Sequence, residues 1–257
     1  MGTSGFAYPD WAPNFYPAGL RASELLSHYA GRLPAVELNN TFYQQPKPDK
    51  ISAWLAATPP DFRFVVKAQR GGSMRALAAR PTQGTASRDP AEDAQQRSED
   101  RLRSQQAAAE TVEWLTAPYR LFGERLGAVL YRVPENMHRD LEKLRLLLEA
   151  WPVDMPLVVE MQNAEWQVDE VFRLLSGHSA TLCATDLDDR DAPDLRLTGR
   201  SIYLRLRRTA YSEADLADWA SRLSAFLDSG TDCFCFFRHD AHGTSALNAE
   251  RLGELLA

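Results

Sequence analysis

The stretch PAVELNNTFYQQP, residues 34–46, contains the unit that decides the fold, which is a short apolar run that ends in polar residues. Because side chains alternate along a strand, Glu37 and Asn39 lie on one face of the strand predicted over residues 35–39. The same order of apolar run, polar end and amphipathic stretch returns along the whole chain. Seven further strands are predicted at residues 2–6, 62–69, 126–134, 155–163, 180–186, 200–208 and 232–240.

Amphipathic stretches follow most of these strands. In residues 21–33, Leu25, Leu26 and Tyr29 have the spacing of one helix face. Eight strand–helix units, with several strands apolar on both faces, predict the α/β class and a (β/α)8 TIM-type barrel that forms a single domain over residues 1–257. A doubly wound open sheet is the alternative, although no G-x-G-x-x-G motif follows the first strand.

Residues 70–106 depart from this order, because they are polar, rich in arginine and poor in large apolar side chains. We predict an insertion after the third strand, with a long loop over about the first twenty residues and the start of an exposed helix over the rest. A solvated loop and helix face is the favoured interpretation. The functional alternative is a lid over the barrel mouth, since loops that follow barrel strands lie on the active face.

Composition limits the function classes. The formal net charge of -6 disfavours a polyanionic partner such as nucleic acid, and no apolar run is long enough to span a membrane. No signal peptide is recognisable, and the three cysteines show no C-x-x-C spacing. These features predict a cytoplasmic protein with small buried thiols. The positive charge is mostly arginine, and lysine is scarce.

Polar residues end nearly every predicted strand, and in a (β/α)8 barrel those ends face the active-site mouth. A lattice of buried charges that only fixes the packing is the structural alternative, but the clustering at strand ends favours a site. The candidate catalytic residues are Glu37, Glu160 and Asp186, as acid, base or orienting carboxylates, and Lys67. The candidate ligand-binding residues are Tyr8, Trp11, Asn39, Tyr43, Arg132, Gln162, Asn163, Arg205, Arg207, Arg238 and His239.

The aromatic and histidine candidates have structural alternatives. The aromatic residues of segment 6–16, together with Phe42 and Tyr43, either wall a pocket at the mouth or plug the top of the barrel, and for most of them the plug is favoured. A divalent cation such as Mg or Mn, held by Glu37, Glu160, Asp186 and His239, is chemically consistent with oxygen ligands. It is not favoured, and no metal ligand is assigned, because the histidine spacing at residues 239–242 is a weak signal.

Several blocks resemble a known family. GTSGFAYPDWAPNFYP, residues 2–17, resembles the opening G-T-S-G-W-x-Y-x-x-W…F-Y-P signature of the YecE-like family of domains of unknown function, and residues 36–46 resemble its V-E-x-N-x-T-F-Y…P block. Later blocks follow in the same order, so the resemblance covers essentially the whole chain. It implies a (β/α)8 barrel and a site at its mouth, but no reaction, because the biochemical activity of the family is not established.

The resemblance also separates kept positions from changed ones. Those that match the family are Glu37, Asn39, Lys67, Glu160, Asp186 and Arg205. Family polar residues are replaced by Arg132, Gln162, Asn163 and Arg207, which implies a divergent member with a divergent active site. Arginine at positions 132, 207 and 238 favours an anionic ligand.

The function predicted from these residues is the binding or transformation of a small polar molecule, anionic or sugar-like, at the barrel mouth. As an enzyme, the protein would use hydrolase, lyase or isomerase chemistry with acid–base catalysis. The alternative is a barrel that has lost the ancestral site and binds a ligand, a protein or a nucleic acid without catalysis.

Overall fold

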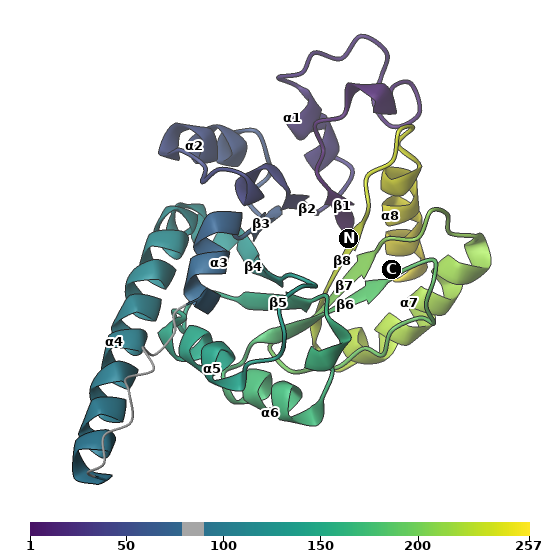
Figure 1. Cartoon of the computed structure of the whole chain (residues 1–257). Helices are drawn as coiled ribbons and strands as arrows, with labels where there is room; N and C mark the ends of the chain where they lie inside the picture. The colour runs from purple at the N-terminus through teal and green to yellow at the C-terminus, as the bar shows by residue number, and fades with distance from the viewer. Residues whose placement is uncertain (79–89) are drawn as a thin grey trace.

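The computed structural model describes residues 1–78 and 90–257, which form a closed barrel of eight parallel strands in sequence order (Figure 1). The barrel closes where β1 pairs with β8, so the predicted (β/α)8 fold is confirmed and the open sheet is excluded. The strands are β1 (Gly2–Ser4), β2 (Ala35–Leu38), β3 (Arg63–Lys67), β4 (Leu126–Val133), β5 (Leu157–Met161), β6 (Thr181–Asp186), β7 (Ser201–Leu206) and β8 (Asp232–Phe237).

Helices surround the barrel on its outside (Figure 1). The α-helices are α1 (Leu25–Ala30), α2 (Pro48–Ala56), α3 (Arg70–Ala78), α4 (Pro90–Thr116), α5 (Leu141–Ala150), α6 (Asp169–Gly177), α7 (Glu213–Asp228) and α8 (Thr244–Leu255). Within the described residues, the 3-10 segments are η1 (Pro9–Trp11), η2 (Asn40–Phe42), η3 (Ala117–Arg125) and η4 (Ala164–Trp166). Residues 187–200, all of them described, join β6 to β7 without a helix.

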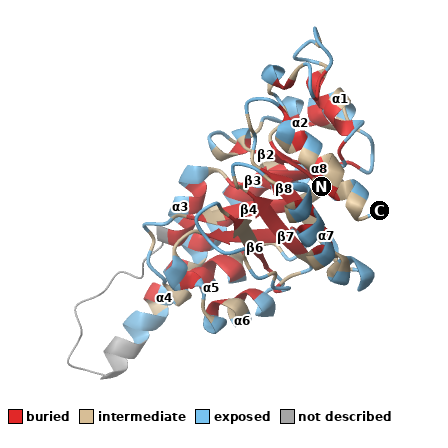
Figure 2. Cartoon of the chain, turned by 90° about the vertical axis from the view of Figure 1, so that its right-hand side faces the viewer, coloured by how far each residue is buried: buried red, intermediate tan, exposed pale blue. Residues whose placement is uncertain are grey.

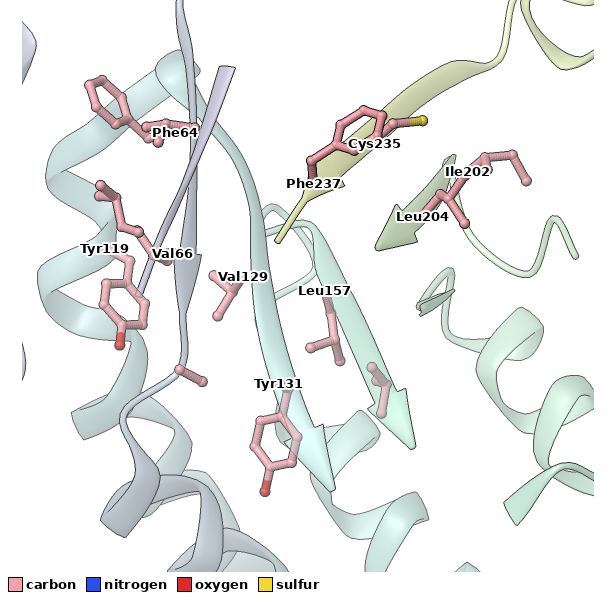
Figure 3. Packing of buried hydrophobic residues seen from close by; sticks show 14 of the residues in the cluster. Phe64, Val66, Tyr119, Val129, Tyr131, Leu157, Ile202, Leu204, Cys235 and Phe237 are labelled. Atoms are coloured by element: carbon pink, nitrogen blue, oxygen red, sulfur yellow. The ribbon is translucent and has the colours of Figure 1, made fainter. Parts of the chain in front are cut away.

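The alternation of side chains along the strands creates two apolar layers. Outward-facing residues pack against the helices, and Figure 3 shows Phe64 and Val66 of β3 on the same side as Tyr119 of η3. The strands are therefore buried while the outer faces of the helices are exposed (Figure 2). A second, smaller apolar cluster fills the barrel interior and consists of Ala35, Val65, Ala128, Leu130, Val158, Cys183, Tyr203 and Phe236. This inner cluster is the floor on which the mouth of the barrel is built.

The prediction for residues 70–106 is corrected in part. Residues 70–78 form helix α3 and not a loop, because Ala76 and Leu77 are buried against the body of the protein. Gly72 permits this close packing, since a Cβ atom there would lie 2.7 Å from the ring of Trp114 on α4. The predicted helix is confirmed as α4, and residues 79–89 of the suggested lid lie outside the described residues.

Helix α4 is the longest of the described helices, with 27 residues. Its composition is polar, as the sequence indicates. Within residues 1–78 and 90–257, no helix combines the length and the apolar character that crossing a membrane requires.

Candidate functional site

The inward-facing positions at the carboxyl ends of the strands are polar. Each of these residues lies two positions after a member of the inner apolar cluster, and therefore on the same face of its strand. Such pairs include Ala35 and Glu37 on β2, Val65 and Lys67 on β3, Leu130 and Arg132 on β4, Val158 and Glu160 on β5, and Tyr203 and Arg205 on β7. The mouth of the barrel is thus a charged layer above an apolar floor.

Arg205 joins two glutamates at the centre of this layer. Its Nη2 donates to Oε1 of Glu37 at 2.7 Å, and its Nη1 donates to Oε1 of Glu160 at 2.6 Å. All three side chains are buried. Glu37 accepts two more hydrogen bonds, from Oγ of Ser4 at 3.0 Å and from the hydroxyl of Tyr203 at 2.8 Å. The two carboxylates and one guanidinium form a rigid network that links β2, β5 and β7.

The electrostatics keep Glu37 ionised. Burial alone would raise the pKa of Glu37, but the charges of Arg205 and Lys67 and the hydrogen bonds from Tyr203 and Ser4 outweigh burial and lower it. Burial would also lower the pKa of Arg205, and the two glutamates reverse that effect and raise it. Glu37 is therefore a fixed negative charge that positions Arg205 and is not a proton donor near neutral pH.

Lys67 stands apart from this network. Thr41 fixes its backbone, because the Thr41 hydroxyl accepts from the Lys67 N–H at 3.0 Å and donates to the Lys67 carbonyl at 2.8 Å. The Lys67 ammonium lies 4.7 Å from the centre of the Phe42 ring. Among the described residues it has neither a hydrogen-bond partner nor a carboxylate within 4.0 Å. Burial, followed by repulsion from Arg205, lowers the pKa of Lys67 to about 8, although Glu37 and Glu160 act in the opposite direction.

A cavity of about 560 Å³ opens beside these residues. Lys67, Arg132, Glu160, Arg205 and Arg207 line its inner part, and the loop 187–200 contributes to its rim. Arg132 donates through Nη2 to Oε1 of Gln162 at 2.5 Å. Within the described part of the chain, the guanidinium of Arg207 has no hydrogen-bond or ion-pair partner. This cavity combines an excess of positive charge with carboxylate and amide groups.

Arg132 also lines a second cavity of about 390 Å³. Its other walls come from Phe42 and Tyr43 on one side and from α3 on the other, with Arg70, Ser73 and Met74. The predicted ligand-binding residue Tyr43 thus lies at this second cavity, with 77% of its surface exposed. Helix α3, which the sequence did not predict, borders the mouth of the barrel.

The structure does not bring Asp186 together with the two glutamates. Thr185 faces the cavity, so Asp186, one position later on β6, faces the helices. There it is fully buried and accepts from Arg208, from the hydroxyl of Tyr211 at 3.0 Å and from the indole N–H of Trp219 at 3.3 Å. This arrangement favours a structural role over the predicted catalytic one.

Two further predicted residues lie away from the cavity for similar reasons. Asn163, one position past the cavity residue Gln162, accepts from the N–H of Glu165 and caps η4. Trp11 is fully buried and donates to the carbonyl of Asp240, so it belongs to the aromatic plug and not to a pocket wall.

Tyr8, Asn39, Arg238 and His239 lie on the β1, β2 and β8 side of the mouth. Tyr8 donates to the carbonyl of Ser4 at 3.1 Å and stacks on the imidazole of His239, with ring centres 4.8 Å apart. Burial, followed by repulsion from Arg207 and Arg238, lowers the pKa of His239, so its ring is neutral at neutral pH. These four residues do not line the 560 Å³ cavity, although Tyr8 interacts with Asn39 and its pKa is raised by burial and by the nearby charge of Glu37.

The structure adds two residues that the sequence did not single out. Tyr203 bonds to Glu37 directly, as Ser4 at the end of β1 does, and Cys183 lines the cavity with its buried thiol. Burial raises the pKa of the Cys183 thiol, which is therefore protonated at neutral pH. Strand alternation could have found Tyr203, because it lies two positions before Arg205 on the same face of β7.

The metal hypothesis receives no geometric support from the described residues. Glu37, Glu160, Asp186 and His239 are all described, and no three of these side chains lie together in a way that could hold a metal ion. Glu37 and Glu160 each direct one oxygen at Arg205, while Asp186 faces the opposite side of its strand.

Comparison with known proteins places the chain in a family. A family model described as protein of unknown function DUF72 matches residues 1–257. The UPF0759 protein YunF of Bacillus subtilis is 21% identical over 290 residues, which include 100% of this chain and 94% of the relative. A solved DUF72 family protein from Thermotoga maritima is 25% identical, with a TM-score of 0.73 and coverage of 100% of this chain and 99% of that one. A second, from Enterococcus faecalis, has the same fold at 19% identity, with a TM-score of 0.69 over 99% of this chain and 94% of its own. The chain belongs to the DUF72 family of proteins of unknown function.

Proposed function

We propose that this protein binds a small anionic molecule at the carboxyl-terminal mouth of the barrel. The observation that carries the proposal is the guanidinium of Arg207, which lines the cavity and has no partner among the described residues. A partly buried guanidinium without a counterion is unfavourable, and a bound anion would supply that counterion. The planar guanidinium can donate two parallel hydrogen bonds to a phosphate or a carboxylate group.

The charge balance of the inner cavity supports an anion. Four cationic side chains line it, those of Lys67, Arg132, Arg205 and Arg207. The glutamates at positions 37 and 160 both form ion pairs with Arg205. Burial, followed by repulsion from Arg205, lowers the pKa of Arg207, and Arg238 adds to the repulsion. A bound anion would relieve this repulsion between cations, which is a gain in free energy specific to negatively charged ligands.

The remaining polar groups would recognise the rest of the ligand. Oε2 of Glu160 is buried without a hydrogen-bond partner among the described residues, and the nearby Nε of Arg132 is 3.8 Å away, too far for a hydrogen bond. Gln162 adds an amide beside it. A ligand hydroxyl could donate to Glu160, so the ligand we propose carries hydroxyl groups as well as its anionic group.

Three expectations from the sequence form part of this proposal. We retain the cytoplasmic location, a small molecule in preference to nucleic acid as the partner, and the YecE-like character of the chain within the DUF72 family. The last of these is supported by the quoted motifs at residues 2–17 and 36–46.

The proposal predicts that Arg207→Gln weakens binding of an anionic ligand about tenfold or more, because a charge-assisted hydrogen bond contributes roughly 1.5–3 kcal/mol. The measurement is a thermal-shift titration with inorganic phosphate, sugar phosphates and small dicarboxylates, followed by calorimetry on whichever compound stabilises the wild type. Uncharged sugars serve as the comparison ligands.

Arg101→Gln is the matched control, since Arg101 is an exposed arginine on α4 that does not line the cavity. It should bind the anion as the wild type does. Equal affinity of Arg207→Gln and wild type, or stabilisation by uncharged sugars alone, would contradict the proposal.

A further inference from the structure

We propose that Lys67 is a nucleophile that forms an imine with a small carbonyl compound bearing a negatively charged group. This inference rests on the anion site proposed above and names the class of compound that the site would take, such as a 2-oxo acid or a phosphorylated aldose. The reasons are the position of Lys67, the absence of a partner for its amine, and the groups that surround it.

Lys67 differs from every other lysine of the chain. The sequence contains four lysines, and Lys47 and Lys50 are exposed. Lys143 pairs with Asp140 at 3.4 Å. Lys67 alone is buried, with 8% of its surface accessible, and it alone lines the 560 Å³ cavity.

The backbone of Lys67 is fixed by hydrogen bonds, and its amine forms no ion pair with the described residues. The Thr41 hydroxyl bonds both the N–H and the carbonyl of Lys67, and the Phe42 ring lies 4.7 Å from Nζ. A structural lysine in a buried network would be expected to bond a carboxylate, as Arg205 does twice. Lys67 instead directs an unpartnered amine at a cavity large enough for a small metabolite.

Charged groups from four neighbouring strands face this amine and set its protonation. Arg205 on β7 and Arg132 on β4 disfavour the ammonium form, as does burial, whereas Glu37 on β2 and Glu160 on β5 favour it. The resulting pKa of about 8 leaves on the order of a tenth of the amine neutral at pH 7. A lysine made nucleophilic by desolvation and by nearby cations is a recognised way to activate an amine toward carbonyl compounds.

The same cations would orient the compound. With the anionic group on Arg207, the carbonyl carbon can approach Lys67 across the cavity that both residues line. Glu160, with its unpartnered Oε2 on the same wall, is the group we assign to carry the proton.

The chemical step balances without an oxidant or a reductant. The Nζ lone pair forms a bond to the carbonyl carbon, and the proton released from nitrogen passes through Oε2 of Glu160 to the carbonyl oxygen. A second proton from solvent reaches that oxygen, the C–O bond breaks, and water leaves. The product is a protonated imine between Lys67 and the former carbonyl carbon.

The test is reductive trapping of the wild-type protein with pyruvate, and separately with glyceraldehyde 3-phosphate, in the presence of cyanoborohydride. Intact mass and peptide mapping then locate the adduct. For pyruvate, the trapped lysine gains the mass of pyruvic acid less one oxygen atom. We expect at least one of the two probes to modify Lys67 about tenfold or more above each other lysine, and inorganic phosphate to reduce the yield.

Two variants and a pH series sharpen the test. Lys50→Arg is the matched control, because Lys50 also lies over an aromatic ring, at 5.6 Å from Trp54, but outside the cavity. It should keep the adduct, whereas Lys67→Arg should lose it. The initial trapping rate should rise between about pH 6 and pH 8 and then level off, because only the neutral amine attacks.

The outcomes separate this inference from the proposed function. Binding of phosphate without any adduct on Lys67, or an adduct spread evenly over the four lysines, would overturn the imine while leaving the anion site intact. An adduct on Lys67 that phosphate does not reduce would support the imine and contradict the anion site. Absence of both phosphate binding and adduct would overturn both.

Discussion

Replacement of Arg205 by methionine is expected to lower the free energy of unfolding by about 3–5 kcal/mol, because it leaves two buried carboxylates without their counterion. Glu37 would keep its hydrogen bonds from Ser4 and Tyr203, whereas the one ion pair within 4.0 Å left to Glu160 among the described residues would be the distant Arg132, at 3.8 Å. Denaturant unfolding measures the effect, with an unchanged slope showing that the compactness of both states is preserved.

The control for this substitution is Arg21→Met, which removes an exposed ion pair with Glu24 at 2.6 Å. An exposed pair contributes about 0–1 kcal/mol, so the two arginines should differ several-fold in effect despite similar ion-pair distances. If Arg205→Met costs no more than Arg21→Met, the charged layer is not a network of mutually dependent buried charges.

The deficit of Arg205→Met should also depend on pH. In the wild type the pKa of Glu37 is lowered, so its contribution to stability is present above the pKa of the unfolded chain and is lost as the pH falls. Without Arg205, the buried carboxylates have raised pKa values, and the folded variant gains stability as they take up protons. The difference between wild type and variant should therefore shrink as the pH falls from about 7 toward 5.

Asp186→Ala is expected to cost about 3 kcal/mol of folding free energy without changing the anion affinity of the folded protein. The substitution leaves the hydroxyl of Tyr211 and the indole of Trp219 without their shared acceptor. The effect is smaller than for Arg205 because Arg208 is partly exposed and keeps Asp215 at 3.5 Å. Denaturant unfolding and calorimetry with the anion measure the two quantities.

Asp188→Ala provides the comparison for Asp186. Asp188 is exposed and accepts two hydrogen bonds from Thr209, both at 2.8 Å, so its loss should cost about 1 kcal/mol or less. A stable Asp186→Ala protein that no longer binds the anion would contradict the purely structural role that we assign to Asp186.

The barrel was predictable because its strands are apolar on both faces and end in polar residues. In Leu157–Met161 of β5, for example, outward Val159 packs against helices, inward Val158 joins the interior cluster, and Glu160 marks the mouth. A strand of an antiparallel sheet with one solvated face would not need this pattern, and the count of eight strand–helix units favoured the barrel over a doubly wound sheet. The charged layer followed from the same alternation, which correctly grouped Glu37, Lys67, Arg132, Glu160 and Arg205 at one end of the barrel.

A polar residue at a strand end can lie on either face of the strand, and its position in the sequence alone did not show which. Asp186 and Asn163 are polar and follow apolar runs, but each lies one residue past a cavity residue and bonds to groups outside the cavity, so their predicted roles stay predictions. Helix α3 was missed because its buried face combines one large apolar residue, Leu77, with small residues such as Gly72 and Ala76 that carry little hydrophobic signal. The partners of a charge, such as Tyr203 on Glu37, depend on contacts between distant strands that no local pattern contains.

The most direct measurement of the central claim is a crystal structure of the protein grown with tungstate, a heavy analogue of phosphate whose anomalous signal locates it. We predict the anion in the 560 Å³ cavity, with its oxygens within roughly 3 Å of the guanidinium of Arg207. Tungstate found only on the outer surface of the barrel, with Arg207 still unpartnered in an empty cavity, would contradict an anion site at the mouth.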